Sequence, residues 1–200
     1  MYGYILTDYS QLKNTYPEFR NCMQKLREDL IRKSAQDWGG SQGPKAFGGM
    51  KPTGGQFGIS TVMPELFNDM SGTRLVTWNQ RLTSTGHQTI MAGAATGNTI
   101  AEDYKVGMIG LAFLSKAQRV TEVKLQISDR KIARINVEEL MAYEQPCLVL
   151  EEGWILDEET GFDLYAYVEA LGYQRIKLIG LQSNRVPNKL QVTNTGAALT

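Results

Sequence analysis

The chain has 200 residues, of which 42% are apolar and 21% are charged, a composition typical of a folded globular protein. It has 21 basic and 21 acidic side chains, so its formal net charge is zero. Non-specific nucleic-acid binding needs a surplus of Lys and Arg to displace counterions from phosphate, so this class of protein is disfavoured. Zero net charge also removes the self-repulsion that keeps copies apart, which favours self-association.

The first segment, up to residue 37, contains a predicted amphipathic helix that begins near residue 16. Its apolar side chains recur at spacings of three and four, and they are Phe19, Cys22, Met23, Leu26 and Leu30. Gly39-Gly40 ends the helix. The helix packs either on its own domain or on a neighbouring subunit. Its mixed charges make a membrane surface the less favoured partner.

Residues 38–72 predict a glycine-rich extended arm. Eight glycines occur from Gly39 to Gly58, with Pro44 and Pro52 among them, and such a sequence disfavours regular structure. Large apolar side chains are spread along the arm, which a plain linker would not need. We therefore expect it to be anchored in grooves of its own domain or of a neighbour. The candidate inter-subunit contacts in helix and arm are Phe19, Leu26, Leu30, Trp38, Phe47 and Phe57.

The remaining sequence predicts about eight strands separated by turns. Residues 106–114 form a nearly continuous apolar run, which indicates a buried strand. In contrast, Val123, Leu125 and Ile127 alternate with polar residues, the pattern of a strand with one buried face. The sequence Ser128-Asp129-Arg130 then turns the chain into a second strand over residues 132–137. Further strands are expected at residues 74–78, 89–91, 99–100, 147–150, 154–156, 164–168, 175–181 and 190–192, and a short helix at residues 65–70.

No long helical segment separates these strands, so the sequence predicts neither βαβ units nor a parallel sheet. The expected fold is mainly β: an antiparallel, jelly-roll-like β-sandwich with an N-terminal helix and a Gly-rich arm. Its two parts are residues 1–72, the helix and arm, and residues 73–200, the β-sandwich domain. The N-terminus has no basic region followed by a long apolar run, so we expect no signal peptide and synthesis in a cytoplasm.

The sequence offers no catalytic motif, and we expect no enzyme activity, no cofactor and no metal site. His87 is the single histidine, and no cysteine lies near it in the sequence, so a zinc ion would have too few ligands there. We interpret His87 as a loop residue between strands. Residues 144–169 carry eight acidic side chains and no Lys or Arg. They are interpreted as solvated turns and strand faces, with calcium binding, catalysis and an inter-subunit charge contact as alternatives.

A helical and glycine-rich N-terminal region followed by about eight antiparallel strands resembles a single jelly-roll capsid protein. The strand spacing of residues 106–186 is similar to that of coat subunits of tailless icosahedral viruses of archaea and thermophilic bacteria. The resemblance implies copies of the same chain as partners in a closed shell, with or without a second coat protein. It implies a location in the virion after synthesis in the host cytoplasm. It implies neither catalytic residues nor direct sequence-specific binding of nucleic acid.

Two other functions are compatible with the sequence. A carbohydrate-binding, lectin-like β-sandwich would use exposed aromatic side chains such as Trp78, Trp154 or Tyr173. A phage tail, fibre or filament subunit would share the self-assembly but not the closed shell.

Overall fold

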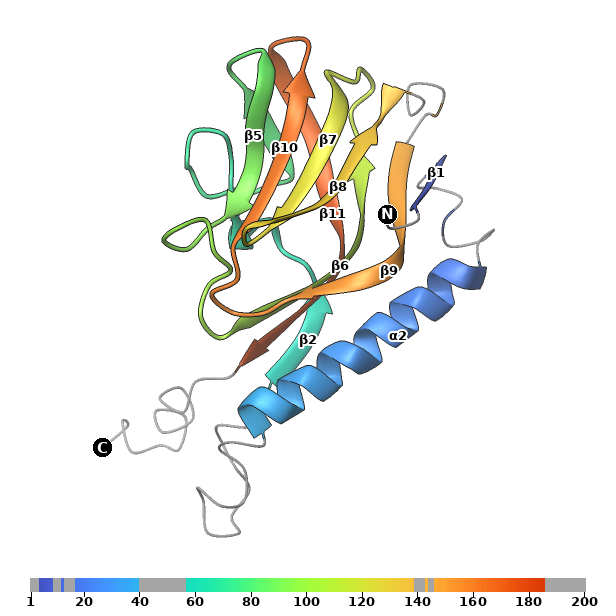
Figure 1. Ribbon diagram of the computed structural model, residues 1–200, viewed down its shortest axis with the longest axis vertical. Helices are drawn as coiled ribbons and strands as arrows, with labels where there is room; N and C mark the ends of the chain where they lie inside the picture. Colours follow the sequence, from blue (N-terminus) through green and yellow to red (C-terminus); the bar gives the residue numbers. More distant parts are fainter. Residues whose placement is uncertain are drawn as a thin grey trace, which may run out of the picture.

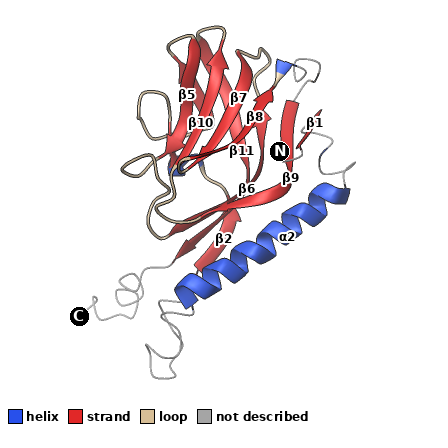
Figure 2. Ribbon diagram, in the orientation of Figure 1, coloured by secondary structure: helices blue, strands red, loops and turns tan. Residues whose placement is uncertain are grey.

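The computed structural model describes residues 4–8, 12, 17–39, 57–138, 143 and 146–185. Within these residues, two antiparallel sheets pack face to face, and one α-helix lies against the outer face of the larger sheet (Figures 1 and 2). The strands are β1 (Tyr4–Asp8), β2 (Phe57–Thr61), β3 (Phe67–Asn68), β4 (Asn79–Leu82), β5 (Gly86–Gly93), β6 (Tyr104–Phe113), β7 (Val120–Ile127), β8 (Arg130–Asn136), β9 (Pro146–Leu156), β10 (Phe162–Val168) and β11 (Gly172–Arg185). The helical elements are α2 (Pro17–Ser34), a π-helical turn η1 (Ala35–Gly39) and a 3-10 turn η3 (Pro64–Leu66).

The strands β4 to β11 pair in a nested order. β7 pairs with β8, β6 with β9, β5 with β10, and β4 with β11. Successive pairs lie in opposite sheets, so the chain folds as one long hairpin that is wrapped around the core. Two further ladders, β11 with β6 and β10 with β7, complete the orders β4-β11-β6-β9 and β5-β10-β7-β8.

Short strands extend these two orders at their edges. β1 pairs with β9, and β2 pairs with the C-terminal half of β11, which makes the larger sheet six-stranded. β3 pairs with β5 and makes the smaller sheet five-stranded. All three of these strands lie within residues 1–72, and residues 40–56 of the arm lie outside the described residues. The boundary at residue 72 stays a prediction.

The core between the sheets consists of inward-facing aliphatic and aromatic side chains from both layers. Phe67 of β3 and Phe162 of β10 are fully buried, and their rings meet edge to face with centroids 5.3 Å apart. Met108 of β6 and Leu125 of β7 belong to the same buried cluster. Such aromatic pairs add about 0.5–1.5 kcal/mol beyond the area that they bury.

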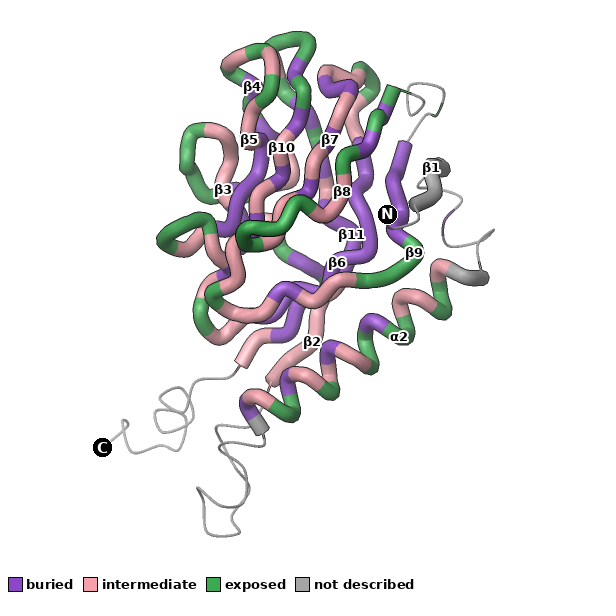
Figure 3. Tube along the Cα trace, viewed as in Figure 1, coloured by how far each residue is buried: buried purple, intermediate pink, exposed green. Residues whose placement is uncertain are grey.

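A second buried cluster lies between α2 and the outer face of the larger sheet. Leu26 of α2 packs there against Ile109 of β6, Val149 of β9 and Ile179 of β11. β6 is therefore buried on both faces, which explains its nearly continuous apolar sequence. Figure 3 shows β6 buried along its length, whereas the outward side of α2 is exposed.

The predicted fold class is confirmed: the protein is mainly β, an antiparallel sandwich with an N-terminal helix. The strands predicted at residues 164–168 and 175–181 are confirmed within β10 and β11, and the predicted hairpin is β7–β8. The two segments predicted at 147–150 and 154–156 form one strand, β9. The strand predicted at residues 190–192 lies outside the described residues.

Three local predictions are wrong. Residues 74–78 form no strand, and Val76 there is 80% exposed, because β-branched residues favour strands only where a half-buried surface is available to pack on. Residues 99–100 form no strand, because Thr99 makes only isolated bridges, one across a tight turn to Ala95 and one to Gly161. The helix predicted at residues 65–70 is the single turn η3 followed by β3, because Phe67 and Asn68 pair with β5.

Candidate functional site

The outer face of the five-stranded sheet is covered by no described helix and carries polar side chains. Along β7, Val123 and Leu125 are buried, whereas Glu122, Lys124 and Gln126 are only partly buried. Successive side chains of a strand point to opposite faces, so these three polar residues lie on the outer face. In β10, Tyr165 and Tyr167 alternate in the same way with buried neighbours.

One row of side chains crosses this face from β5 to β7. His87 lies opposite Tyr167, which lies opposite Glu122. The rings of His87 and Tyr167 meet edge to face with centroids 5.1 Å apart. Lys124 Nζ lies 3.4 Å from His87 Nδ1, and Glu122 Oε1 lies 3.8 Å from the same nitrogen. The interpretation of His87 as a loop residue is wrong, because β5 begins at Gly86.

A second row contains Tyr165, Lys124 and Arg134, and the next contains Gln126 and Lys131. Arg134 and Lys131 are three positions apart on β8, so a regular strand would place them on opposite faces. The register between β7 and β8 shifts between Leu125 and Gln126, which inserts one extra residue in β8. This β-bulge brings both cations to the same side of the sheet.

Glu122 holds the cations of this face in place. Arg134 Nε donates to Glu122 Oε2 at 2.6 Å, and Lys124 Nζ lies 3.3 Å from Oε1. Burial alone would raise the pKa of Glu122, but the hydrogen bond from Arg134 and the positive charges of Arg134 and Lys124 outweigh it and lower that pKa. Oε1 makes no hydrogen bond of good geometry within the described residues, so its interaction with Lys124 is mainly electrostatic.

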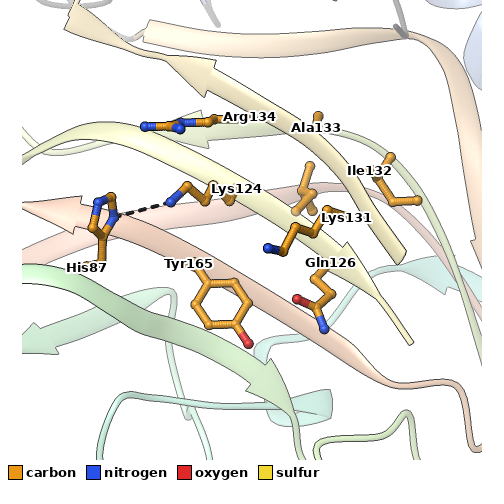
Figure 4. Close-up of a pocket in the computed structure, with 9 residues that line it drawn as sticks. His87, Lys124, Gln126, Lys131, Ile132, Ala133, Arg134 and Tyr165 are labelled. Atoms are coloured by element: carbon orange, nitrogen blue, oxygen red, sulfur yellow. Dashed lines mark hydrogen bonds between the residues drawn. The ribbon is translucent and has the colours of Figure 1, made fainter. Parts of the chain in front are cut away.

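These side chains line an open pocket of about 550 Å³ on the outer face of the sheet (Figure 4). Lys124 and Lys131 reach into it from β7 and β8, and Tyr165 and Gln126 border it from β10 and β7. The full lining consists of His87, Lys124, Leu125, Gln126, Lys131, Ile132, Ala133, Arg134 and Tyr165. The pocket therefore combines cationic donors, an amide, an aromatic ring and an apolar floor, which suits reversible binding of a polar anionic group.

The predicted inter-subunit contacts in α2 and the arm have a different setting. Leu26, Leu30 and Trp38 are buried within their own chain, at most 3% exposed. Phe19 is partly buried against the cluster under α2, and the Phe57 ring lies 6.3 Å from that of Trp38. The helix thus packs on its own domain, which is one of the two alternatives for it. Phe47 lies outside the described residues, and its role stays a prediction.

The C-terminal end of the helical segment is fixed to the sheet by a buried cation. Lys105 of β6 is 1% exposed, and its Nζ lies 2.8 Å from Asp37 Oδ2 and 2.9 Å from Asp157 Oδ1. The same ammonium lies 5.0 Å from the centre of the Trp38 ring, a cation–π contact. Lys33 bridges both carboxylates from α2. The hydrogen bond from Lys105 lowers the pKa of Asp37 more than burial raises it.

Part of the acidic segment at residues 144–169 is therefore used inside the chain. Asp157 binds Lys105 and Lys33, and Glu158 accepts hydrogen bonds from Trp38 Nε1 and the Asp103 backbone. In the described residues no group of three or more His, Cys, Asp or Glu side chains is placed to hold a metal ion.

The aromatic residues considered for a lectin are divided between core and surface. Trp78 and Trp154 pack against the core between the sheets, whereas Tyr173 at the start of β11 is 60% exposed. The aromatic side chain at the pocket is a different one, Tyr165.

Comparisons with known proteins leave the site to be judged by its geometry. No protein-family model matches this chain, and no curated protein and no solved structure matches it. Among the described residues, no helix has the length and apolar character needed to cross a membrane.

Proposed function

We propose that this chain is a structural, self-assembling subunit rather than an enzyme, and more specifically a viral coat subunit of the jelly-roll class. The observation that carries the proposal is the nested pairing of β4 to β11. A jelly roll is an eight-stranded double sheet with two Greek keys, and the nested pairing of these eight strands supports the proposal that this sandwich is of that class. Jelly rolls are common among viral capsid domains.

The edges of the sandwich supply a route to lateral assembly. β8 is an outermost strand of the smaller sheet and pairs with β7 alone among the described residues, whereas the other edge strand, β3, is partly covered by a bridge between Asn68 and Arg74. An open strand edge presents unpaired backbone donors and acceptors that another chain can approach. The balance of 21 basic and 21 acidic side chains leaves no net repulsion to oppose close packing of copies.

The helix contributes to the subunit rather than to its neighbours in this proposal. Its apolar side covers the larger sheet of its own chain, so it gives each copy a complete core before assembly. Contacts between copies then come from sheet edges, from loops and from the residues outside the described ranges. The virion is the location that this function implies.

The proposal is tested by light scattering coupled to size-exclusion chromatography, with negative-stain microscopy of each peak. A coat subunit is expected to give closed particles of many copies, and open filaments would instead favour a fibre subunit. A chain that stays monomeric at high concentration, in low and high salt, contradicts self-assembly as its function.

A lectin-like function is the second candidate because of the pocket on the five-stranded sheet. The two functions are compatible, since the lining residues belong to one chain and lie on a sheet face rather than at the ends of the sandwich.

A further inference from the structure

We propose that the pocket on the outer face of the five-stranded sheet binds a carboxylate-bearing saccharide, such as one that ends in a uronic or a sialic acid. The lining offers both of the surfaces that such a ligand needs: cations for the carboxylate, and an aromatic ring beside an amide for the sugar. All lining residues come from one chain, so the proposal does not depend on self-assembly.

The cationic side of the pocket is only partly neutralised by the protein. Lys124 and Arg134 share one carboxylate, that of Glu122. Lys131 makes no ion pair or side-chain hydrogen bond with any described residue, and it is exposed. The three cations therefore carry a surplus of positive charge in the pocket. Because Glu122 holds two of them in position, little ordering is required of those side chains when an anion binds.

A neighbouring carboxylate, that of Asp163, lies outside the pocket lining. Asp163 lies opposite Gln126 in register. Asn98 Nδ2 donates to Asp163 Oδ1 at 2.9 Å, and burial raises the pKa of this carboxyl above its ordinary value. The pocket thus has no acidic residue in its lining to repel an anion.

The other side of the pocket fits a sugar ring. Tyr165 presents a partly exposed aromatic ring, and the Gln126 amide beside it can donate to and accept from hydroxyl groups. Ile132 and Ala133 of β8 also belong to the lining, where they pack against the core between the sheets. The volume, about 550 Å³, lies within the range of roughly 300–1,000 Å³ that is usual for small-molecule sites.

Three simpler ligands would leave part of the pocket unused. A neutral sugar would leave the cations without a partner, and an inorganic anion would leave Tyr165 and the apolar floor unfilled. A long polyanion would bind through charge alone and would not need the aromatic ring. Each of these alternatives is a distinct outcome of the binding measurement.

The test is isothermal titration calorimetry on the full chain with sialyllactose and a glucuronic-acid-terminated disaccharide, against lactose, sodium sulfate and heparin. The variants are Lys131→Gln and Tyr165→Ala. Their matched controls are Lys116→Gln, exposed in the β6–β7 connection, and Tyr173→Ala, exposed at the start of β11. Circular dichroism confirms that each variant is folded before binding is measured.

Saturable binding of at least one acidic sugar is expected, at least about tenfold tighter than that of lactose. Lys131→Gln and Tyr165→Ala should each weaken it by about tenfold, and the two controls should leave it unchanged. The proposal is overturned if lactose binds equally well, or if sulfate or heparin binds as tightly and Tyr165→Ala has no effect. The absence of saturable binding by both acidic sugars also overturns it.

Discussion

The two outer faces of the sandwich are built from the same alternation of side chains but have opposite surroundings. On the larger sheet, α2 covers a cluster of apolar outward side chains that includes Ile109 of β6, Val149 of β9 and Ile179 of β11. On the smaller sheet, the outward side chains of β7 and β10 are polar or aromatic, and no described helix covers them. The first face serves the stability of the fold, and the second is open to solvent among the described residues.

The largest effect on stability is expected from a substitution in the face that α2 covers. Leu26 is 3% exposed and fits above Gly107 and Gly153, where a Cβ would come within 3.0 Å and 2.8 Å of its Cδ1. Leu26→Ala is expected to lower the free energy of unfolding by about 2–5 kcal/mol, because it leaves a cavity between helix and sheet. Urea unfolding measures the loss.

The control for this variant is the next residue towards the N-terminus. Lys25 is exposed on the outer side of α2, so Lys25→Ala should change the free energy of unfolding by no more than about 0.5 kcal/mol. Equal stability of Leu26→Ala and the unchanged chain would mean that α2 does not pack as described.

A smaller effect is expected where the covered face carries charge. Lys105→Met removes the buried cation between Asp37 and Asp157 and leaves two carboxylates with Lys33 as their remaining partner. We expect a loss of about 1–3 kcal/mol in urea unfolding, less than for a fully buried pair, because both carboxylates are partly exposed. Adding Asp37→Asn should recover part of the loss, and a double variant that is less stable still would contradict the network.

Acidification should lower the stability that both faces contribute, since each face holds a carboxylate with a lowered pKa. The hydrogen bond from Lys105 lowers the pKa of Asp37, and for Glu122 the hydrogen bond from Arg134 and the charges of Arg134 and Lys124 outweigh burial. A carboxylate whose pKa is lower in the folded state contributes stability that is fully present above its unfolded pKa, which is 3.8 for Asp37 and 4.5 for Glu122. This stability is lost as the pH falls through the folded-state pKa.

The variants Asp37→Asn and Glu122→Gln should therefore each flatten the loss of stability on acidification, measured by urea unfolding across this pH window. High salt should reduce the Glu122 contribution more, because its partner Arg134 is 67% exposed whereas Lys105 is buried. An acid transition that neither variant alters would exclude these two groups as its cause.

The smallest effect is expected on the bare face. Lys131 is exposed and pairs with no described carboxylate. Lys131→Gln should therefore change the free energy of unfolding by no more than about 0.5 kcal/mol, and the midpoint of thermal unfolding should hardly move. A clear destabilisation by this variant would show that the bare face also serves the fold.

The sequence predicts the two faces better than it predicts the pocket. The apolar run at residues 106–114 reflects a strand buried on both sides, and the alternation of Val123, Leu125 and Ile127 reflects one bare side. The stripe containing Leu26 and Leu30 likewise predicts a helix that needs a partner surface. The stripe alone does not say whether that surface belongs to the same chain, because amphipathicity identifies the apolar side and not its neighbour.

The pocket and the Lys105 network depend on contacts that the sequence does not encode locally. His87, Lys124 and Tyr165 come from three strands, and only their register places them side by side. The bulge in β8 that brings Lys131 and Arg134 to one face leaves no sign in the sequence. The polar residues that alternate with Val123, Leu125 and Ile127 are a signal for this face, but they predict only a strand with one buried face and not a pocket.

We propose that this chain assembles through its edges and keeps the five-stranded sheet facing solvent. A cryo-electron microscopy reconstruction of the purified assembled chain tests it most directly. We expect closed particles in which the pocket around Lys124, Lys131 and Tyr165 is open to solvent. Particles in which that sheet face is buried between copies, or a preparation without assemblies, would contradict it.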